Sequence, residues 1–123
     1  MTLDANIIIA YLSGDQVVID MLSRWRTTGS PLFLSTVAEA EVLSFSKWNN
    51  QELDATEKFL QEGFTSIVFD RSIAHLAANI RRSTRIKLPD AAIAATALFT
   101  HTPLVTRNQR DFKAVDGLTV LGI

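Results

Sequence analysis

Four acidic residues stand where predicted strands end or predicted helices begin, and together they could hold a metal ion. Asp4 ends the first short strand, and Glu41 lies in the helix that follows the second strand. Asp90 lies in the first turn of an alanine-rich helix, and Asp111 comes just after the fourth strand. Strand ends and helix starts share one edge of a parallel sheet, where such folds bind their ligands. We therefore expect the four carboxylates at that edge.

Carboxylates that converge repel one another, and each raises the pKa values of the others. A hard divalent cation removes this penalty, and Mg²⁺ or Mn²⁺ prefers oxygen ligands of this kind. A metal ion on clustered carboxylates can activate water and stabilise charge on a phosphate that is being cut. Asn6, Thr106 and Asn108 could hold the carboxylates or the metal-bound waters in place.

Three of the acids also have a purely structural interpretation. Asp4 could cap the helix that begins at Ala5, and Asp90 could complement the dipole of its helix. Asn108 could cap a short helix with Asp111 at its third position, which would be a loose capping box. The pattern alone leaves both interpretations open for these acids.

The helix after the second strand contains two acids, and the sequence assigns them different roles. Thr36 to Glu39 fits a capping box, which gives Glu39 a structural role. Glu41 has Val37 and Phe45 among its neighbours on the helix face, and these look like core residues. A carboxylate on an apolar face is costly unless it finds a partner. We therefore expect Glu41, not Glu39, to join the site.

The elements that must position these acids alternate along the chain. With 123 residues, 47% of them hydrophobic and 20% charged, the chain is long and apolar enough for one domain with its own core. Short apolar strands alternating with helices predict an α/β fold, with a central parallel sheet of four to five strands and helices on both faces. We expect strands at 2–4, 32–34, 65–69, 103–106 and 118–121, and helices at 5–12, 16–25, 35–46, 51–61, 71–80, 89–99 and 108–112.

Composition excludes several other classes of protein. The chain has no cysteine, which fits a reducing cytoplasm and excludes a disulfide scaffold or a thiolate metal site. The apolar run at 7–10 is too short to span a membrane, and no signal peptide precedes it. A formal net charge of -1 does not by itself indicate a nucleic-acid binder. Any nucleic-acid binding must therefore come from local basic residues and a metal.

Four segments around these acids resemble, in order and spacing, the four motifs of PIN domains. The nearest resemblance is to the VapC toxin branch of type II toxin–antitoxin systems, and it covers nearly the whole chain. The segments are Leu3-Asp4-Ala5-Asn6, Ser35-Thr36-Val37-Ala38-Glu39-Ala40-Glu41-Val42, Leu88-Pro89-Asp90-Ala91-Ala92-Ile93-Ala94 and Leu104-Val105-Thr106-Arg107-Asn108-Gln109-Arg110-Asp111-Phe112.

The resemblance implies a PIN-like fold over residues 1–123 and a Mg²⁺-dependent endoribonuclease, with Mn²⁺ as a possible substitute. The acidic quartet of that family falls on Asp4, Glu41, Asp90 and Asp111, as catalytic and metal-binding residues. Ala5 departs from the pattern, because the family often has Thr or Ser there. The resemblance also implies RNA as the substrate, a cognate VapB-like antitoxin and a homodimer, all in the cytoplasm.

Other residues receive weaker assignments. Six basic residues could contact the RNA backbone, although an ordinary solvated face is an equal alternative. We expect an exposed Trp48 in a dimer contact, and an antitoxin groove walled by the segments 18–25 and 45–48. His75 and His101 lie in no motif and receive no catalytic role. The basic residues are Arg81, Arg82, Arg85, Lys87, Arg107 and Arg110.

Two other functions remain open at this stage. The chain could be a housekeeping PIN nuclease for RNA processing that has no antitoxin. It could also be a non-enzymatic switch like a receiver domain, which gathers acids at the same sheet edge. Receiver domains need a lysine on the late strands, but here that region has Thr106 and Arg107, and Lys113 follows only after Asp111. The switch is therefore the least favoured of the three.

Overall fold

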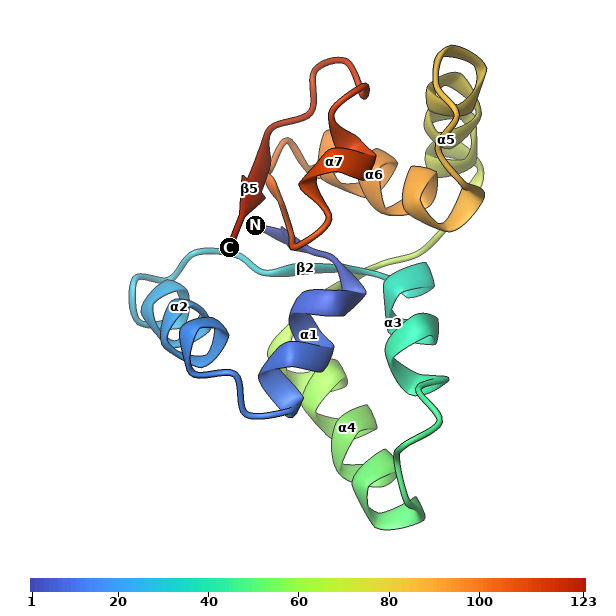
Figure 1. Cartoon of the computed structure of the whole chain (residues 1–123). Helices are drawn as coiled ribbons and strands as arrows, with labels where there is room; N and C mark the ends of the chain where they lie inside the picture. The colour runs from blue at the N-terminus through green and yellow to red at the C-terminus, as the bar shows by residue number, and fades with distance from the viewer.

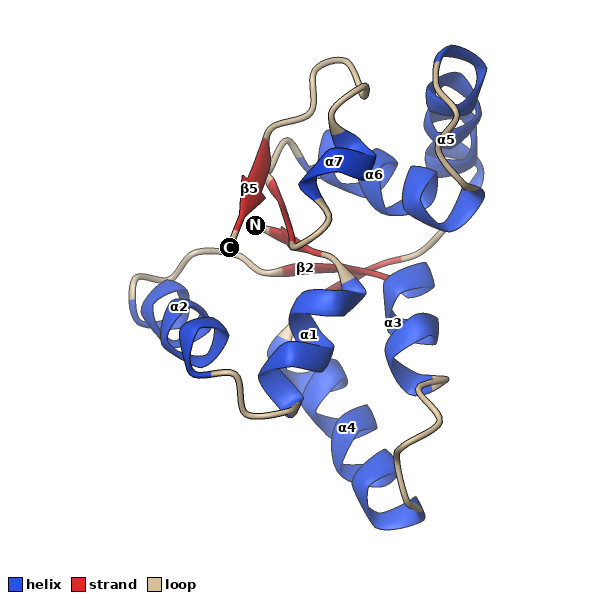
Figure 2. Cartoon of the chain, in the orientation of Figure 1, coloured by secondary structure: helices blue, strands red, loops and turns tan.

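Five short parallel strands form one central sheet, and helices cover both of its faces (Figures 1 and 2). The structure is a computed structural model that describes residues 1–123. The strands are β1 (Thr2–Leu3), β2 (Phe33–Ser35), β3 (Thr65–Ile67), β4 (Leu104–Thr106) and β5 (Val120–Gly122), in the spatial order β3-β2-β1-β4-β5. The predicted α/β class with a parallel sheet is therefore confirmed.

Seven helices flank the sheet. In the view of Figure 1, α1 to α4 lie on one side of β2, and α5 to α7 lie on the other. The helices are α1 (Ala5–Leu12), α2 (Gln16–Thr27), α3 (Thr36–Leu43), α4 (Asn50–Gly63), α5 (Arg71–Ser83), α6 (Leu88–Thr100) and α7 (Gln109–Phe112). No single helix is long and apolar enough to cross a membrane; the sharply bent pair of α1 and α2 meets that criterion jointly, by length and composition only.

Helix α6 is the buried centre of the fold. Every residue from Ala91 to Ala97 is buried, and the helix packs on α3, α5, β1 and β2. Alanine side chains are small, so the helix can lie close to all of these neighbours. The helix ends at His101, whose left-handed backbone (φ 54°) turns the N–H of Thr102 back to the carbonyl of Ala97 (3.1 Å). His101 thus has a structural role that the sequence did not suggest.

The predicted helix caps are partly right. Asp4 accepts a hydrogen bond from the N–H of Ala5 at the start of α1, as expected. Asp15 and Asp70 cap α2 and α5 in the same way. The capping box predicted for α3 is wrong: Ser35 caps the helix and accepts from the N–H of Val37. Because Ser35 is also the last residue of β2, the helix begins directly after the strand. The hydroxyl of Thr36 instead accepts from the N–H of Phe69, and Glu39 makes no capping contact.

The expected dimer contact and groove walls do not match the surface. Trp48 is half-buried, and its indole N–H donates to the carbonyl of Val42 (2.9 Å). Val18 and Leu22 are buried in the core. Strand β3 stops at Ile67, which leaves Val68 64% exposed beyond the sheet. The indole therefore bonds a carbonyl in the last turn of α3. Most of the apolar face of α2 packs against the core.

The tight packing of α6 predicts a penalty for larger side chains. Ala94 is fully buried, so Ala94→Leu should lower the free energy of unfolding by about 1–3 kcal/mol through overpacking. Leucine is nearly as good a helix former as alanine, so propensity cannot explain such a loss. Urea titration gives the value. The matched control is Ala55→Leu on the exposed face of α4, which should change it by less than about 0.5 kcal/mol. Equal effects at the two positions would contradict the packing argument.

Candidate active site

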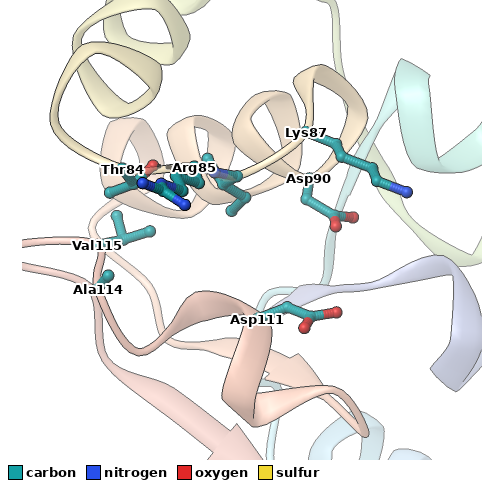
Figure 3. A pocket seen from close by; sticks show the side chains of 8 residues that line it. Thr84, Arg85, Lys87, Asp90, Asp111, Ala114 and Val115 are labelled. Carbon is teal, nitrogen blue, oxygen red and sulfur yellow. Dashed lines mark hydrogen bonds between the residues drawn. The ribbon is translucent and has the colours of Figure 1, made fainter.

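The structure brings the four acids together at one edge of the sheet. Asp4 follows β1, Asp111 lies in α7 after β4, Asp90 lies in the first turn of α6, and Glu41 lies in α3. Figure 3 shows Asp90 and Asp111 on facing walls of a cavity, with both carboxylates pointing to the same side. The cavity has a volume of about 450 Å³. The geometry thus matches the expectation that parallel topology places these acids at a common edge.

Asp4 is the most firmly held of the four. It is 5% exposed, and its Oδ1 accepts from the N–H of Ala5 (2.8 Å). Its Oδ2 accepts from the hydroxyl of Thr106 (2.8 Å). That hydroxyl also accepts from the backbone N–H of Asn108 (3.0 Å) and from the side-chain amide of Asn6 (3.4 Å). Asp4 therefore has one fixed orientation, and each oxygen keeps a free lone pair.

The three predicted supporting residues act in different ways. Thr106 bonds Asp4 directly, and Asn6 reaches both Thr106 and the N–H of Arg107 (3.4 Å). Asn108 contributes only its backbone N–H. It stands at the start of α7, but its side chain makes no capping hydrogen bond, so the loose capping box with Asp111 is absent.

The charges of the acids raise one another's pKa values. Burial is the main cause of the raised pKa of Asp4, and the charges of Asp90 and Asp111 add to it. Hydrogen bonds from Thr106 and Ala5 oppose this shift. For Asp90, burial is again the first cause of the raised pKa and Asp111 the second, while Lys87 lowers it. Each shift means that the folded chain disfavours the ionised carboxylate at this edge.

Glu41 belongs to this group, but not for the reason that the sequence suggested. Its side chain is exposed rather than set in an apolar core. Partial desolvation of the carboxyl group is nevertheless the largest cause of its raised pKa, followed by the charges of Asp4 and Asp90. Glu39 lines a different cavity between α3 and α4, with Leu43 among its neighbours. Of the two acids, only Glu41 lies with the quartet.

The four acids form an open cluster rather than a closed metal site. No three His, Cys, Asp or Glu side chains lie close enough together to enclose a metal ion. Such an arrangement fits Mg²⁺ or Mn²⁺, because Mg²⁺ keeps several waters and binds through one or two carboxylates plus substrate phosphates. Zinc prefers nitrogen and sulfur ligands, but the chain has no cysteine, His75 is an exposed residue of α5, and His101 ends α6. The donor set therefore favours a hard cation.

The six basic residues proposed for RNA do not all face this edge. Arg85 and Lys87 line the cavity with Asp90 and Asp111. Arg110 lines a second, wholly polar cavity on the other side of Asp111, and Lys113, which the sequence analysis left out, lines it as well. The position of Lys113 two residues after Asp111 could have indicated this. Two short basic walls therefore flank the acids.

The other three arginines bond to the protein itself. Arg107 forms an ion pair with Asp15 (2.7 Å), although it also borders the second cavity. Arg82 donates to the side chain of Asn79, and Arg81 donates to a backbone carbonyl in the α5–α6 loop. These contacts occupy part of the donor capacity of the three arginines, and their contact with RNA stays a prediction.

The chain is similar to known proteins over nearly its whole length. The family model of the PIN domain matches residues 1–118. A chain of a toxin–antitoxin complex from Klebsiella pneumoniae is 30% identical, with a TM-score of 0.82 over 99% of this chain and 98% of that one. A chain of VapBC2 from Rickettsia felis, bound to a DNA fragment from its promoter, is 19% identical, with a TM-score of 0.85 over 99% and 97%. A chain of FitAcB from Neisseria gonorrhoeae is 24% identical, with a TM-score of 0.78 over 98% and 96%. No curated protein sequence matches the chain.

The raised pKa values predict how stability depends on pH in a metal-free buffer. In the unfolded chain the carboxyls of Asp4, Glu41 and Asp90 ionise at about pH 4. In the folded chain they ionise at higher pH. The folded chain binds more protons in this window, so its free energy of unfolding falls as pH rises. Asp90→Asn removes one such group, and it should therefore increase the free energy of unfolding at pH 7 but not below about pH 4.

Urea titrations in EDTA at the two pH values measure this difference. Glu39→Gln is the matched control, because it removes a carboxylate from another cavity and should show no comparable gain at pH 7. A gain for Asp90→Asn that persisted at low pH would contradict the electrostatic explanation.

Proposed function

The chain belongs to the PIN domain family, and we propose that it is a metal-dependent endoribonuclease that serves as the toxin of a type II toxin–antitoxin system. PIN domains are nucleases. The observation that carries the proposal is the convergence of Asp4, Glu41, Asp90 and Asp111 at one sheet edge, where their charges act on one another. Family membership removes the receiver-like switch from consideration.

The four acids have separable roles in the proposed reaction. When bound, Mg²⁺ would supply a water of lowered pKa and a positive charge beside the phosphate. Asp90 and Asp111, on facing walls of the cavity, would hold the ion. Asp4 would also hold it, because the orientation of its carboxylate is fixed by Thr106 and Ala5. Glu41 is the most suitable proton acceptor, since its pKa is raised and its side chain is exposed.

The substrate and partners follow from charge and from the related complexes. A phosphodiester backbone would meet Arg85 and Lys87 on one side of the acids, and Arg110 and Lys113 on the other. The 30% identical chain comes from a toxin–antitoxin complex, which supports a VapB-like antitoxin for this chain. An arginine from that antitoxin could pair with the carboxylates and displace the metal. We also propose a homodimer, with the exposed Val68 replacing Trp48 as an apolar candidate for its contact.

Removal of the metal and substitution of the four acids together test the catalytic proposal. Cleavage of single-stranded RNA should stop in EDTA and return with Mg²⁺ or Mn²⁺. Asp90→Asn and Asp111→Asn should each lower the rate by at least about 100-fold, because each removes a ligand charge that the reaction needs. Glu39→Gln should retain the wild-type rate, since this residue lies in another cavity. Cleavage that resisted chelation, or that depended on Glu39 and not on Glu41, would overturn the assignment.

Expression in cells tests the toxin proposal. The chain alone should arrest growth, and the Asp90→Asn variant, expressed at the same level, should not. Co-expression of the small gene that neighbours this one should restore growth, and the two products should co-purify. RNase activity should then be recovered only after the partner is stripped away. Harmless expression of an active nuclease that captures no small partner would favour the housekeeping alternative.

A further inference from the structure

The cavity that holds Asp90 and Asp111 extends past these acids to the α5–α6 loop. Figure 3 shows Arg85 and Thr84 on the side of the cavity away from the two carboxylates, with Ala114 and Val115 below them. The volume of about 450 Å³ falls in the range of about 300–1,000 Å³ that is typical of small-ligand sites. The lining residues beyond the acids are three apolar ones, two cations and one hydroxyl: Ile86, Ala114, Val115, Arg85, Lys87 and Thr84.

The loop that carries the two cations is braced by its neighbours. The hydroxyl of Thr84 donates to the carbonyl of Ile80 (2.8 Å) and accepts from the N–H of Ile86 (3.3 Å). The Nε of Arg81 donates to the carbonyl of Ile86 (3.3 Å). Both backbone groups of Ile86 are thus bonded, so the backbone that carries Arg85 is held in place, while no hydrogen bond within the protein holds its guanidinium.

The two cations in this cavity have different surroundings. Lys87 lines the cavity beside Asp90, and Figure 3 shows the two side chains pointing to the same side. Arg85 pairs with no acid, because the only ion pair of the structure joins Arg107 to Asp15. The hydroxyl of Thr84 is already used within the loop. Arg85 is therefore the free donor of the cavity, and it stands opposite apolar walls rather than opposite a carboxylate.

We propose that this cavity binds the nucleotide next to the scissile phosphate of a single-stranded RNA, which rests on the ribonuclease function proposed above. The guanidinium of Arg85 binds the phosphate of that nucleotide, and Arg is well suited to bidentate contacts with phosphate oxygens. The base lies against Ile86 and Val115. Lys87 offsets the charge of Asp90 at the point where the backbone passes the acids. Arg81 is a positioning residue that acts through the Ile86 carbonyl.

RNA binding without cleavage tests this subsite. The background variant is Asp4→Asn, which removes a buried acid outside the cavity, and circular dichroism checks its fold. Fluorescence anisotropy with a labelled short single-stranded RNA of mixed sequence, in Mg²⁺, should show about tenfold weaker binding for Arg85→Ala. The slope of log affinity against log salt should decrease in magnitude by about 0.7, the value for one phosphate contact on a single strand.

The matched control is Arg71→Ala. It removes the same charge from an exposed position at the start of α5, outside the residues assigned to RNA. It should leave both the affinity and the salt slope unchanged. Arg81→Ala should weaken binding less than Arg85→Ala, and the double variant should bind no more weakly than Arg85→Ala alone, because Arg81 acts only through Arg85. Additive losses would overturn the positioning role.

The outcomes separate this subsite from the ribonuclease function. If the wild-type chain cleaves RNA and Arg85→Ala binds it like Arg71→Ala, the subsite is wrong and the nuclease stands. If Arg85→Ala alone weakens binding but no version of the chain cleaves RNA, the subsite stands and the catalytic proposal is wrong. A chain that binds no single-stranded RNA overturns both.

Discussion

Repulsion between like charges at the edge of the sheet is the constraint on which the rest of this structure depends. The pKa values of Asp4, Glu41 and Asp90 are all raised, mainly by burial and further by the charges of neighbouring acids. Such an arrangement persists only where the surrounding fold holds the carboxylates in place. Here the fold holds some of the four carboxylates more firmly than others. Asp4 is buried and doubly hydrogen-bonded, whereas Glu41 and Asp111 remain exposed, where water screens their charges.

The register of the sheet explains why Asp4 can be held so firmly. Strands β1 and β4 pair in parallel with Leu3 beside Val105, and the N–H of Asp4 donates to the carbonyl of Val105 (3.0 Å). The next residue of each strand is then Asp4 and Thr106, so the hydroxyl and the carboxylate meet. The buried alanines of α6 complete the arrangement, because close packing of that helix on β1 and β2 brings Asp90 to the same edge.

Much of this could be predicted from the sequence because parallel topology leaves few choices. Alternating strands and helices fix which ends share an edge. The sequence pattern alone therefore predicts Asp4, Asp90 and Asp111 at the same edge of the sheet. The errors lie where a contact joins residues far apart or an element ends one residue early. Arg107 pairs with Asp15 across 92 positions, and no local pattern indicates that pairing. Trp48 covers the end of α3 instead of facing solvent, although the carbonyl of Val42 to which it donates lies only six residues earlier.

The distribution of basic residues shows how a nearly neutral chain can be suited to an anionic substrate. The formal net charge is -1, so the chain as a whole exerts little long-range attraction on RNA. Of the six basic residues proposed for RNA, three bond to Asp15, Asn79 and the α5–α6 loop, whereas Arg85, Lys87 and Arg110 line the two cavities beside Asp111. Screening at physiological salt acts over about 8 Å, so these cations matter mainly to a strand already in contact. On the proposed function, affinity would therefore depend on the metal ion and on close contacts, and a mobile basic segment of a partner could compete for the acids at the same short range.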